Sequence, residues 1–411
     1  MSTGSNRRSF VKAAALMAAT AASRDRVLGA NERLRLGIIG TGGRGTYLMH
    51  RVPETAGTQW VAVCDIYDVR RGNAAKLAGP QAVQTDDYRQ ILDRKDIDAV
   101  IIATPDHWHA RMAIDACQAG KDIYIEKPMT THPEDGLKVV KAAREHKRIV
   151  QVGVQQRSGP HYIAAKREVM DKGLLGKVGL VRTWYNSNRG FLAPIPPGMD
   201  KKPEGLDWKR YLGPLSPIPW DPKRYFNRFA YWDISTGGQI GGLYVHLIDT
   251  VHWYLGIDKP AATLAGGGIY YYNDGRDTPD VVNIIAEYSA AISTTFEAEI
   301  LTAGIDQMAV PTAGMEFRGT GGILTVYRGP WRDGYVFVPN AANSKSSPLR
   351  APYVQTDAQP HLLNWLDCVR TRQRPAADEV SGHYSAVACH MALVSYKEKV
   401  RVRWNQAWEV S

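Results

Sequence analysis

Three glycines near the start of the chain have the spacing of a phosphate-binding turn. The segment LGIIGTGGRG places Gly40, Gly42 and Gly45 in a G-x-G-x-x-G pattern. The first glycine of such a pattern permits a tight turn, the second lets a pyrophosphate approach the backbone, and the third lets a helix pack on the preceding strand. The phosphates then lie at the positive N-terminus of that helix. We therefore predict a dinucleotide cradle, which also includes Gly43 and Arg44.

An acidic residue follows the next predicted strand. Residues 60–64 form a short apolar run, and Asp65 comes directly after it, 20 residues beyond Gly45. A carboxylate at this place accepts hydrogen bonds from the hydroxyls of an adenosine ribose and repels an added phosphate. The sequence therefore favours NAD over NADP, although Arg70 and Arg71 lie close enough to soften that preference.

Two later peptides combine residue types that can handle protons. They are TPDHWH at residues 104–109 and EKP at residues 126–128, and each follows a predicted strand. Oxidation of a secondary alcohol by hydride transfer requires a nearby group that takes the hydroxyl proton or stabilises the alkoxide. Lys127 can do either, because burial lowers the pKa of a lysine towards neutral pH.

The elements that must position these peptides alternate between strand and helix. Buried strands are predicted for five apolar runs, at residues 34–39, 60–64, 99–103, 122–125 and 151–155. Helices are predicted at residues 46–52, 110–119 and 134–147. This alternation predicts a parallel sheet covered by helices on both faces, with ligands bound where the strands end.

The glycine turn, the T-P-x-x-x-H peptide and the E-K-P peptide, in this order, resemble the Gfo/Idh/MocA family of NAD(P)-dependent oxidoreductases. The resemblance extends from about residue 33 to about residue 400. It implies an α/β Rossmann domain followed by an α+β domain with an open, mainly antiparallel sheet, and sugars or polyols as substrates. It also implies that Glu126 contacts the nicotinamide ribose and that Lys127 acts beside the reacting carbinol.

The chain departs from the family pattern at one position. Many relatives carry D-x-x-x-H at the start of a helix in the second domain, with both side chains facing the substrate. His246 matches that histidine, but Gly242 occupies the place of the aspartate. We predict proton handling by Lys127 and His246, and we expect another group, with Tyr244 as a candidate, to orient His246.

Further contacts are assigned from placement along the chain. Three residues are predicted to contact the nicotinamide side of the cofactor: His109, Glu126 and Gln155. Three others are predicted to position the substrate: Trp108, Arg157 and Tyr244. A metal site formed by His107, His109 and His246 is not favoured, because paired loop histidines without a carboxylate partner more often form local hydrogen bonds.

The pattern changes beyond residue 155. Residues 292–300 alternate between apolar and polar side chains, which predicts an antiparallel strand with one solvated face. Its predicted companions are residues 177–185, 262–272, 281–288 and 323–327. We therefore divide the chain into residues 1–30 as a signal segment, 31–155 as the Rossmann domain, and 156–411 as a substrate and oligomerisation domain. The resemblance implies homo-oligomers formed through the second sheet.

An insertion rich in proline and aromatic residues lies between Arg189 and Trp232. Aromatic rings beside a cleft would suit the apolar faces of sugar rings. Loops of this length are uncommon unless they are packed or functional, and we predict that most of these rings form a small core of the insertion itself.

The first thirty residues resemble a twin-arginine export signal. Arg7 and Arg8 precede Phe10, and a short alanine-rich apolar run follows at residues 13–22. No segment has the about 20 apolar residues that a membrane helix needs. We expect export to the periplasm by the twin-arginine machinery. Because this signal class implies transport of folded proteins, we also expect NAD to be tightly bound before export.

The composition argues against several other classes of protein. Hydrophobic residues make up 44% and charged residues 22%, which is typical of globular domains. The four cysteines lie far apart and form no C-x-x-C pair. Of the net charge of +10, residues 1–30 contribute +4, from five basic residues and one aspartate. The remaining basic residues are scattered, so we expect no nucleic-acid partner.

Three functions remain open from the sequence. The main prediction is an NAD-dependent oxidoreductase that acts on a carbinol of a sugar or sugar derivative. The alternative is an exported NAD-dependent glycosidase, similar to the α-N-acetylgalactosaminidases, which uses transient oxidation, elimination and return of the hydride. The absent aspartate and the export signal favour the alternative, whereas the E-K-P peptide favours the main prediction. The third is a sugar-binding protein that retains the cofactor without turnover.

Overall fold

The first domain contains a six-stranded parallel sheet. The computed structural model describes residues 33–186, 192–301, 312–329, 333–342 and 345–411, so the predicted signal segment lies outside the described residues. The sheet order is β3-β2-β1-β4-β5-β6. The strands are β1 (Leu34–Ile39), β2 (Thr58–Cys64), β3 (Val83–Thr85), β4 (Ala99–Ile102), β5 (Asp122–Ile125) and β6 (Val150–Val152). Strands β4 and β5 are buried along their whole length, as their continuous apolar runs predict.

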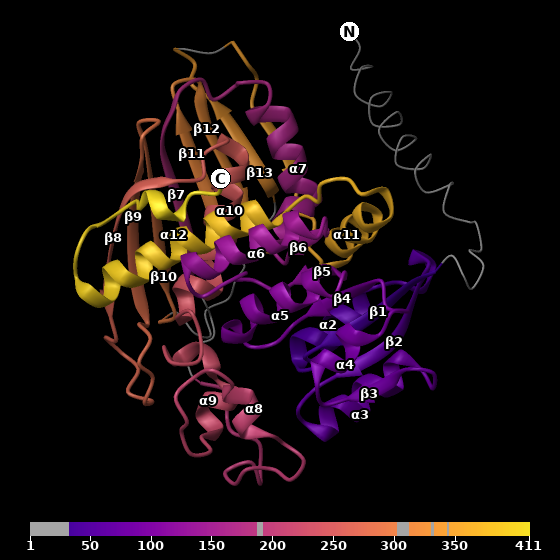
Figure 1. The fold of residues 1–411 in the computed structure, drawn as a ribbon. Coiled ribbons are helices and arrows are strands. Elements are labelled where there is room, and N and C mark those ends of the chain that lie inside the picture. The colour runs from indigo at the N-terminus through magenta and orange to yellow at the C-terminus, as the bar shows by residue number, and fades with distance from the viewer. Residues whose placement is uncertain (1–32, 187–191, 302–311, 330–332, 343–344) are drawn as a thin grey trace.

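Helices cover both faces of this sheet (Figure 1). The helices are α2 (Gly43–Arg51), α3 (Asp68–Ala78), α4 (Tyr88–Asp93), α5 (Asp106–Gln118) and α6 (Pro133–Glu145). Helix α11 (Gln359–Thr371) returns from the far end of the chain and shares a core with α2 and α3. Its Trp365 is fully buried and packs edge-on against Tyr124 of β5, with ring centroids 5.8 Å apart. The first domain is therefore completed by residues beyond position 155.

The second domain contains a nine-stranded sheet in the order β14-β13-β12-β11-β7-β10-β9-β8-β15. The strands are β7 (Val178–Asn186), β8 (Pro260–Gly268), β9 (Val281–Tyr288), β10 (Ile292–Glu299), β11 (Ala313–Gly319), β12 (Gly322–Tyr327), β13 (Asp333–Pro339), β14 (Leu349–Pro352) and β15 (Val402–Arg403). Neighbouring strands are antiparallel except for the parallel pair β7 and β10. The predicted fold class, a Rossmann domain followed by an open, mainly antiparallel sheet, is confirmed.

Three helices pack on one face of the second sheet. They are α7 (Pro160–Ala165), α10 (Val245–Leu255) and α12 (Glu379–Glu398). The long helix α12 also contacts α6, so it joins the two domains (Figure 1). Along β9 the buried and exposed side chains alternate, which leaves the other face of the sheet open. None of the described helices is both long and apolar enough to cross a membrane.

The insertion forms a small aromatic core, which confirms the prediction for its rings. It contains α8 (Trp208–Leu212) and α9 (Pro222–Phe226). Trp208 stacks on Tyr211 with centroids 4.9 Å apart and meets Trp220 edge-on at 5.0 Å. The insertion is attached to the first domain, because Leu206 pairs with Tyr67 in an isolated β-bridge. It therefore extends across the carboxyl ends of the parallel strands.

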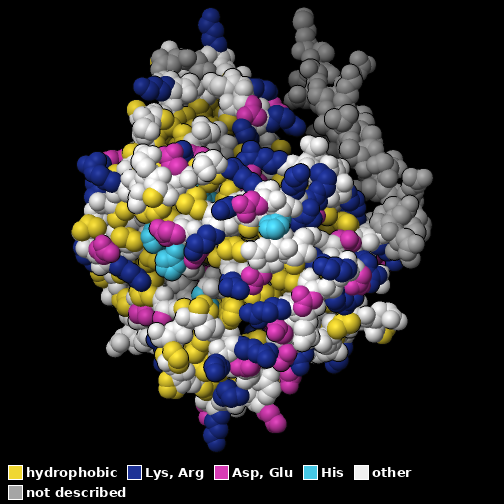
Figure 2. All heavy atoms as spheres, viewed as in Figure 1, with side chains coloured by type: hydrophobic (Ala, Val, Ile, Leu, Met, Phe, Trp, Pro, Cys, Tyr) yellow, Lys and Arg dark blue, Asp and Glu magenta, His cyan; other side chains and the backbone are white. Residues whose placement is uncertain are grey.

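Charged side chains are spread over the face of the molecule shown in Figure 2. Lysine and arginine side chains alternate there with acidic and apolar ones and do not gather into a continuous stripe.

Candidate functional site

The glycine-rich turn has the close approaches that its sequence predicts. Gly40 has φ +86°, and a Cβ added there would lie 2.8 Å from the carbonyl carbon of Ala103. A Cβ on Gly45 would lie 2.0 Å from the carbonyl oxygen of Gly40, so the start of α2 can reach the end of β1 only without a side chain. By contrast, a Cβ on Gly43 would meet nothing within 4 Å. The turn thus forms a bare backbone cradle at the N-terminus of α2, which fits a pyrophosphate.

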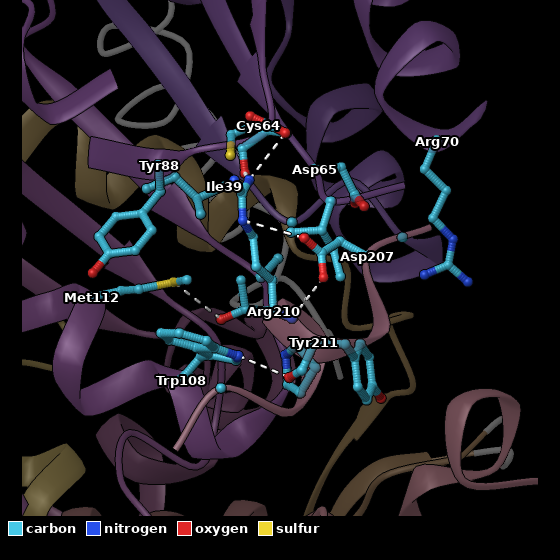
Figure 3. Close-up of a pocket in the computed structure, with 18 of the residues that line it drawn as sticks. Ile39, Cys64, Asp65, Arg70, Tyr88, Trp108, Met112, Asp207, Arg210 and Tyr211 are labelled. Carbon is cyan, nitrogen blue, oxygen red and sulfur yellow. Dashed lines mark hydrogen bonds and ion pairs between the residues drawn. The ribbon is translucent and has the colours of Figure 1, made fainter. Parts of the chain in front are cut away.

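A cavity of about 780 Å³ adjoins this turn (Figure 3). Figure 3 shows Ile39, Cys64 and Asp65 at the strand ends, with Trp108 and Tyr211 on the opposite side. Helices α8 and α9 of the insertion supply part of the lining, so the insertion covers the cavity. The volume suits a cofactor-sized ligand, and the strand ends are the expected place for one.

Asp65, the predicted ribose contact, lines this large cavity, and the chain itself orients its carboxylate. Its Oδ2 accepts hydrogen bonds from the backbone nitrogen (2.7 Å) and hydroxyl (3.1 Å) of Thr41, and its Oδ1 accepts from the nitrogen of Tyr67 (2.9 Å). Carboxylate oxygens can accept about four hydrogen bonds in all, so acceptor capacity remains for a ribose. Arg71 is occupied with Asp68 at 2.5 Å.

Of the two arginines that follow Asp65, Arg70 and not Arg71 lines the large cavity. Its guanidinium lies 4.7 Å above the ring of Tyr225, a residue of the insertion. Its Nη1 lies 3.2 Å from the position of a Cβ on Gly42, so it is next to the phosphate cradle.

Arg44 connects the glycine turn to the end of β5. Its Nε and Nη2 lie 2.8 Å and 2.7 Å from Oε1 of Glu126. Burial opposes the charge of Arg44, but the Glu126 carboxylate outweighs burial and raises the pKa of the arginine. With its amide oriented to satisfy both neighbours, Gln155 accepts from Arg44 and donates to the carbonyl of Gly153 at 3.1 Å. The structure therefore brings together three of the predicted cofactor residues, which are Arg44, Glu126 and Gln155.

Two smaller cavities continue from the large one. A cavity of about 530 Å³ shares Arg44, Thr104 and Arg228 with the large cavity. A third cavity, of about 450 Å³, shares four residues with the second: Lys127, Phe229, His246 and Arg328. The series of cavities runs from the glycine turn, past Arg44, to Lys127 and His246. It therefore suits a long cofactor with a small substrate at its end.

Lys127 forms a hydrogen bond to the backbone of Gly242, the residue that stands where the resemblance implies an aspartate. Its Nζ donates to the carbonyl oxygen of Gly242 at 2.8 Å. Gly242 belongs to a π-helical turn (Ile240–Tyr244) that leads into α10, and such turns are frequent at functional sites. Burial lowers the pKa of Lys127 to about 8, although Glu126 and Asp106 act in the opposite direction. The neutral carbonyl of Gly242 thus contacts the ammonium group of Lys127.

His246 is oriented by Gln156, a residue that the sequence did not identify. His246 is 4% exposed, and its Nδ1 lies 3.0 Å from Oε1 of Gln156. Burial, together with the nearby cations Arg328 and Lys127, lowers the pKa of His246 well below its ordinary value. The neutral ring therefore donates from Nδ1 to Gln156 and leaves Nε2 as an acceptor. Only the position of Gln156, next to Gln155 after β6, could have suggested this role.

The structure does not bring the three predicted substrate residues into the two smaller cavities. Tyr244 is 2% exposed and packs in the core of the second domain against Phe296, with ring centroids 5.0 Å apart. Arg157 forms a bidentate ion pair with buried Asp249, at 2.8 Å and 2.9 Å. Trp108 lines the large cavity instead, where its Nε1 donates to the carbonyl of Tyr211 at 3.0 Å.

His109 joins the two peptides that follow β4 and β5. It lines the 530 Å³ cavity, but its Nδ1 and Nε2 lie 2.7 Å and 3.0 Å from the carbonyl oxygens of Pro128 and Thr104. Both ring nitrogens thus face the backbone, and its predicted cofactor contact would be made through the ring surface. The ring nitrogens of His107 face the carbonyls of Tyr211 and Ile234. The part of the chain that the structure describes contains no group of three His, Cys, Asp or Glu residues able to hold a metal ion.

A buried carboxylate near Lys127 also escaped the sequence prediction. Asp106 is 1% exposed and accepts from the hydroxyl of Thr236 at 3.0 Å. Burial opposes its charge, but Arg228, His109 and Lys127 outweigh burial and lower its pKa. Its Oδ1 has no hydrogen-bond partner among the described residues and lies 4.0 Å from Nε of Arg228. Asp106 therefore supplies negative charge beside the Lys127 ammonium.

Residues 34–154 match the family model Gfo/Idh/MocA, described as an oxidoreductase family with an NAD-binding Rossmann fold. The matched residues are those of the first domain. Over 176 residues it is 33% identical to inositol 2-dehydrogenase of Rubrobacter xylanophilus, an alignment that covers 42% of this chain and 48% of the relative. The chain thus spans about half the length of this curated relative.

Two further comparisons extend beyond the residues that match the family model. Over 380 residues the chain is 26% identical to inositol 2-dehydrogenase 4 of Saccharopolyspora erythraea, covering 90% of this chain and 96% of the relative. A solved structure of levoglucosan dehydrogenase in complex with NADH and levoglucosan matches with a TM-score of 0.68 at 19% identity, covering 91% of this chain and 100% of that chain. The first domain and the second sheet therefore occur together in a known fold.

Proposed function

We propose that this protein is an NAD-dependent oxidoreductase that transfers hydride between the cofactor and a carbinol of a sugar or sugar derivative. The observation that carries the proposal is Lys127, an amine with a pKa of about 8 on the wall of two joined cavities that continue from the glycine turn. The match of the first domain to the Gfo/Idh/MocA family model and the relatives named as inositol 2-dehydrogenases support it.

The residues present fit a bound dinucleotide. The bare backbone at Gly42, in the turn that Gly40 permits, would accept the pyrophosphate, and Asp65 would accept hydrogen bonds from the adenosine ribose. When bound, NAD supplies the acceptor for the hydride and its reduced form supplies the donor. In the direction of oxidation, the neutral amine of Lys127 takes the hydroxyl proton of the substrate. Nε2 of His246 accepts a hydrogen bond from a neighbouring hydroxyl of the sugar and so orients the substrate.

We propose that NAD, rather than NADP, is bound and that it is retained through purification. The insertion supports retention, because it covers the large cavity and is fixed to the first domain by several contacts. The backbone nitrogen of Asp207 donates to the carbonyl of Ile66 at 3.1 Å, and Nη1 of Arg210 lies 3.0 Å from Oδ2 of Asp86. Denaturing the purified protein and identifying the released nucleotide tests both points.

Export and assembly are part of the same proposal. We propose that the twin-arginine signal directs the folded protein to the periplasm and that the open sheet face forms a homo-oligomer. Leu264 and Ile285 face each other across β8 and β9 on that face, and they are 46% and 47% exposed. Fractionation of cells producing Arg7→Lys/Arg8→Lys protein tests export, and light scattering tests assembly.

The function is tested by mixing the purified protein with a panel of free sugars and nitrophenyl glycosides without added cofactor. We expect the absorbance of reduced nicotinamide to appear with one or more free sugars. Release of nitrophenol over many turnovers would instead identify the redox-neutral glycosidase. Ligand-dependent thermal shifts without either reaction would identify a binding protein.

Replacing Gly242 by aspartate is expected to shift the pH profile of this reaction. The position has room, because a Cβ there would lie 3.7 Å from Phe229, an ordinary contact distance. A carboxylate beside Lys127 favours the ammonium and raises its pKa by about one to two units. The pH at which sugar oxidation is half-maximal should therefore increase from about 8. The control Gly242→Asn has the same shape without the charge and should not reproduce the shift. An equal shift in both variants would contradict the electrostatic explanation.

A further inference from the structure

The two smaller cavities have an excess of positive charge. Their lining contains five basic side chains, from Arg44, Lys127, Arg228, Arg276 and Arg328. The described lining contains one carboxylate, that of Glu126, and it is already paired with Arg44. Arg276 is paired with Asp274 at 2.5 Å, and Arg228 lies 4.0 Å from Asp106. No described carboxylate lies within ion-pair distance of Arg328.

Arg328 is held in place although it has no acidic partner among the described residues. It directly follows β12, and its backbone nitrogen donates to the carbonyl of Ala313 at 2.9 Å. Its guanidinium lies 5.1 Å above the ring of Tyr185, which also lines the 530 Å³ cavity. Its Nη1 is buried and has no hydrogen-bond partner among the described residues. Buried donors are nearly always paired, so this nitrogen calls for an acceptor other than the described residues, which a ligand in the cavity can supply.

We propose that the substrate of the proposed oxidoreductase is an acidic sugar, a uronate or an aldonate, and that Arg328 binds its carboxylate. This inference rests on the proposed function, because the same cavities contain Lys127 and His246. The planar fork of an arginine matches the two oxygens of a carboxylate and forms paired, charge-assisted hydrogen bonds. One end of the sugar would thus be fixed at Arg328 while a carbinol of the same molecule faces Lys127.

The charge of Arg328 acts on both proposed proton-handling groups. It is one of the cations that lower the pKa of His246 and of Lys127, after the larger effect of burial. An anion bound at Arg328 would offset this positive charge. The cavities are therefore electrostatically suited to a negatively charged substrate and not only to a neutral polyol.

The experiment is isothermal titration of the protein, with the cofactor it retains, against matched pairs of sugars. The pairs are glucuronate and glucose, galacturonate and galactose, and gluconate and glucitol; glucose 6-phosphate is titrated as well. We expect at least one acid to bind about 10- to 100-fold more tightly than its neutral partner, which is typical for a charge-assisted pair. Arg328→Gln should remove this difference, and Arg328→Lys, which keeps the charge without the fork, should retain part of it.

A matched control removes an arginine elsewhere on the same sheet. Arg318 of β11 is exposed and paired with Glu316 at 2.7 Å, so Arg318→Gln should leave the preference unchanged. Circular dichroism and thermal melting check that the variants are folded. If Arg328→Gln is not folded, the preference for acids measured in Arg328→Lys tests the inference instead. Equal affinity for acids and neutral sugars, or a preference that survives both Arg328 variants, would overturn the inference. So would tighter binding of glucose 6-phosphate than of every carboxylate.

Hydride transfer is measured separately in the same samples. Selective binding of an acid without formation of reduced nicotinamide would contradict the proposed oxidoreductase, while Arg328 would remain a carboxylate site. Oxidation of neutral sugars with kcat/KM equal to that of their acids would leave the oxidoreductase intact and overturn the acidic-substrate inference. The two proposals therefore fail in distinguishable ways.

Discussion

Replacing Lys127 by methionine is expected to lower kcat for sugar oxidation by a factor of about 10² to 10⁴, the usual contribution of a positioned acid or base. Methionine fills similar space but cannot accept a proton. Binding of NAD should be unaffected, because the glycine turn at Gly40 and the proposed ribose acceptor Asp65 are unchanged. Stopped-flow absorbance of reduced nicotinamide and release of the nucleotide on denaturation measure the two properties.

The pH dependence of the unmodified protein should report the same lysine. Lys127 can accept a proton only as the neutral amine, and its pKa is about 8. The rate of oxidation should therefore increase as the pH rises through about 8, and the rate of the reverse reduction should decrease. This dependence should disappear in Lys127→Met. It should persist in the control Lys138→Met, which removes an exposed lysine of α6. A pH dependence that remained in the Lys127 variant would assign it to another group.

Replacing Gly40 by alanine is expected to weaken the binding of reduced NAD by roughly 10- to 100-fold, as judged from the usual 1–3 kcal/mol of backbone strain. The residue has φ +86°, and the new Cβ would lie 2.8 Å from the backbone of Ala103. The turn must shift to relieve the unfavourable φ and the close contact. This shift moves the backbone groups that are expected to face the phosphates. Fluorescence titration of protein stripped of nucleotide measures the dissociation constant, and thermal melting measures the loss of stability.

A glycine outside the turn provides the control for that result. Gly72 lies in α3 and does not line the large cavity; a Cβ there meets nothing within 4 Å, and its φ is not in the left-handed region. Gly72→Ala should therefore bind reduced NAD almost as the unmodified protein does. Similar losses in both variants would mean that an added methyl group in this domain, and not the strain at Gly40, weakens binding. Unchanged affinity in both would argue that the phosphates lie elsewhere.

The first domain and its strand ends could be predicted because the signals are local. A fully buried strand shows as an apolar run, a tight turn shows as glycine spacing, and ligands bind where parallel strands end. Strand β1 and the positions of Asp65, Glu126 and Lys127 followed directly from these rules. The partner that orients His246 did not, since Gln156 reaches it through a contact between residues 90 positions apart.

The contacts that were not predicted depend on distant packing. Arg157 is adjacent to the site in sequence, but a buried carboxylate on α10, Asp249, binds its guanidinium. Strand β13 escaped prediction because apolar Val336 and Val338 point away from the core and hide the alternation of Tyr335 and Phe337. Helix α11 has an apolar face in the sequence, but that face does not specify which of the two sheets it covers.

The contact between Lys127 and the carbonyl of Gly242 has a consequence for how this site can vary. A peptide oxygen neither gains nor loses a proton at any pH at which proteins fold. The carbonyl of Gly242 therefore keeps its charge while the amine of Lys127 titrates. No exchange of one amino acid for another deletes a main-chain oxygen. A point mutation at position 242 can therefore place a new side chain beside the amine of Lys127, but it cannot remove the main-chain oxygen that accepts the hydrogen bond.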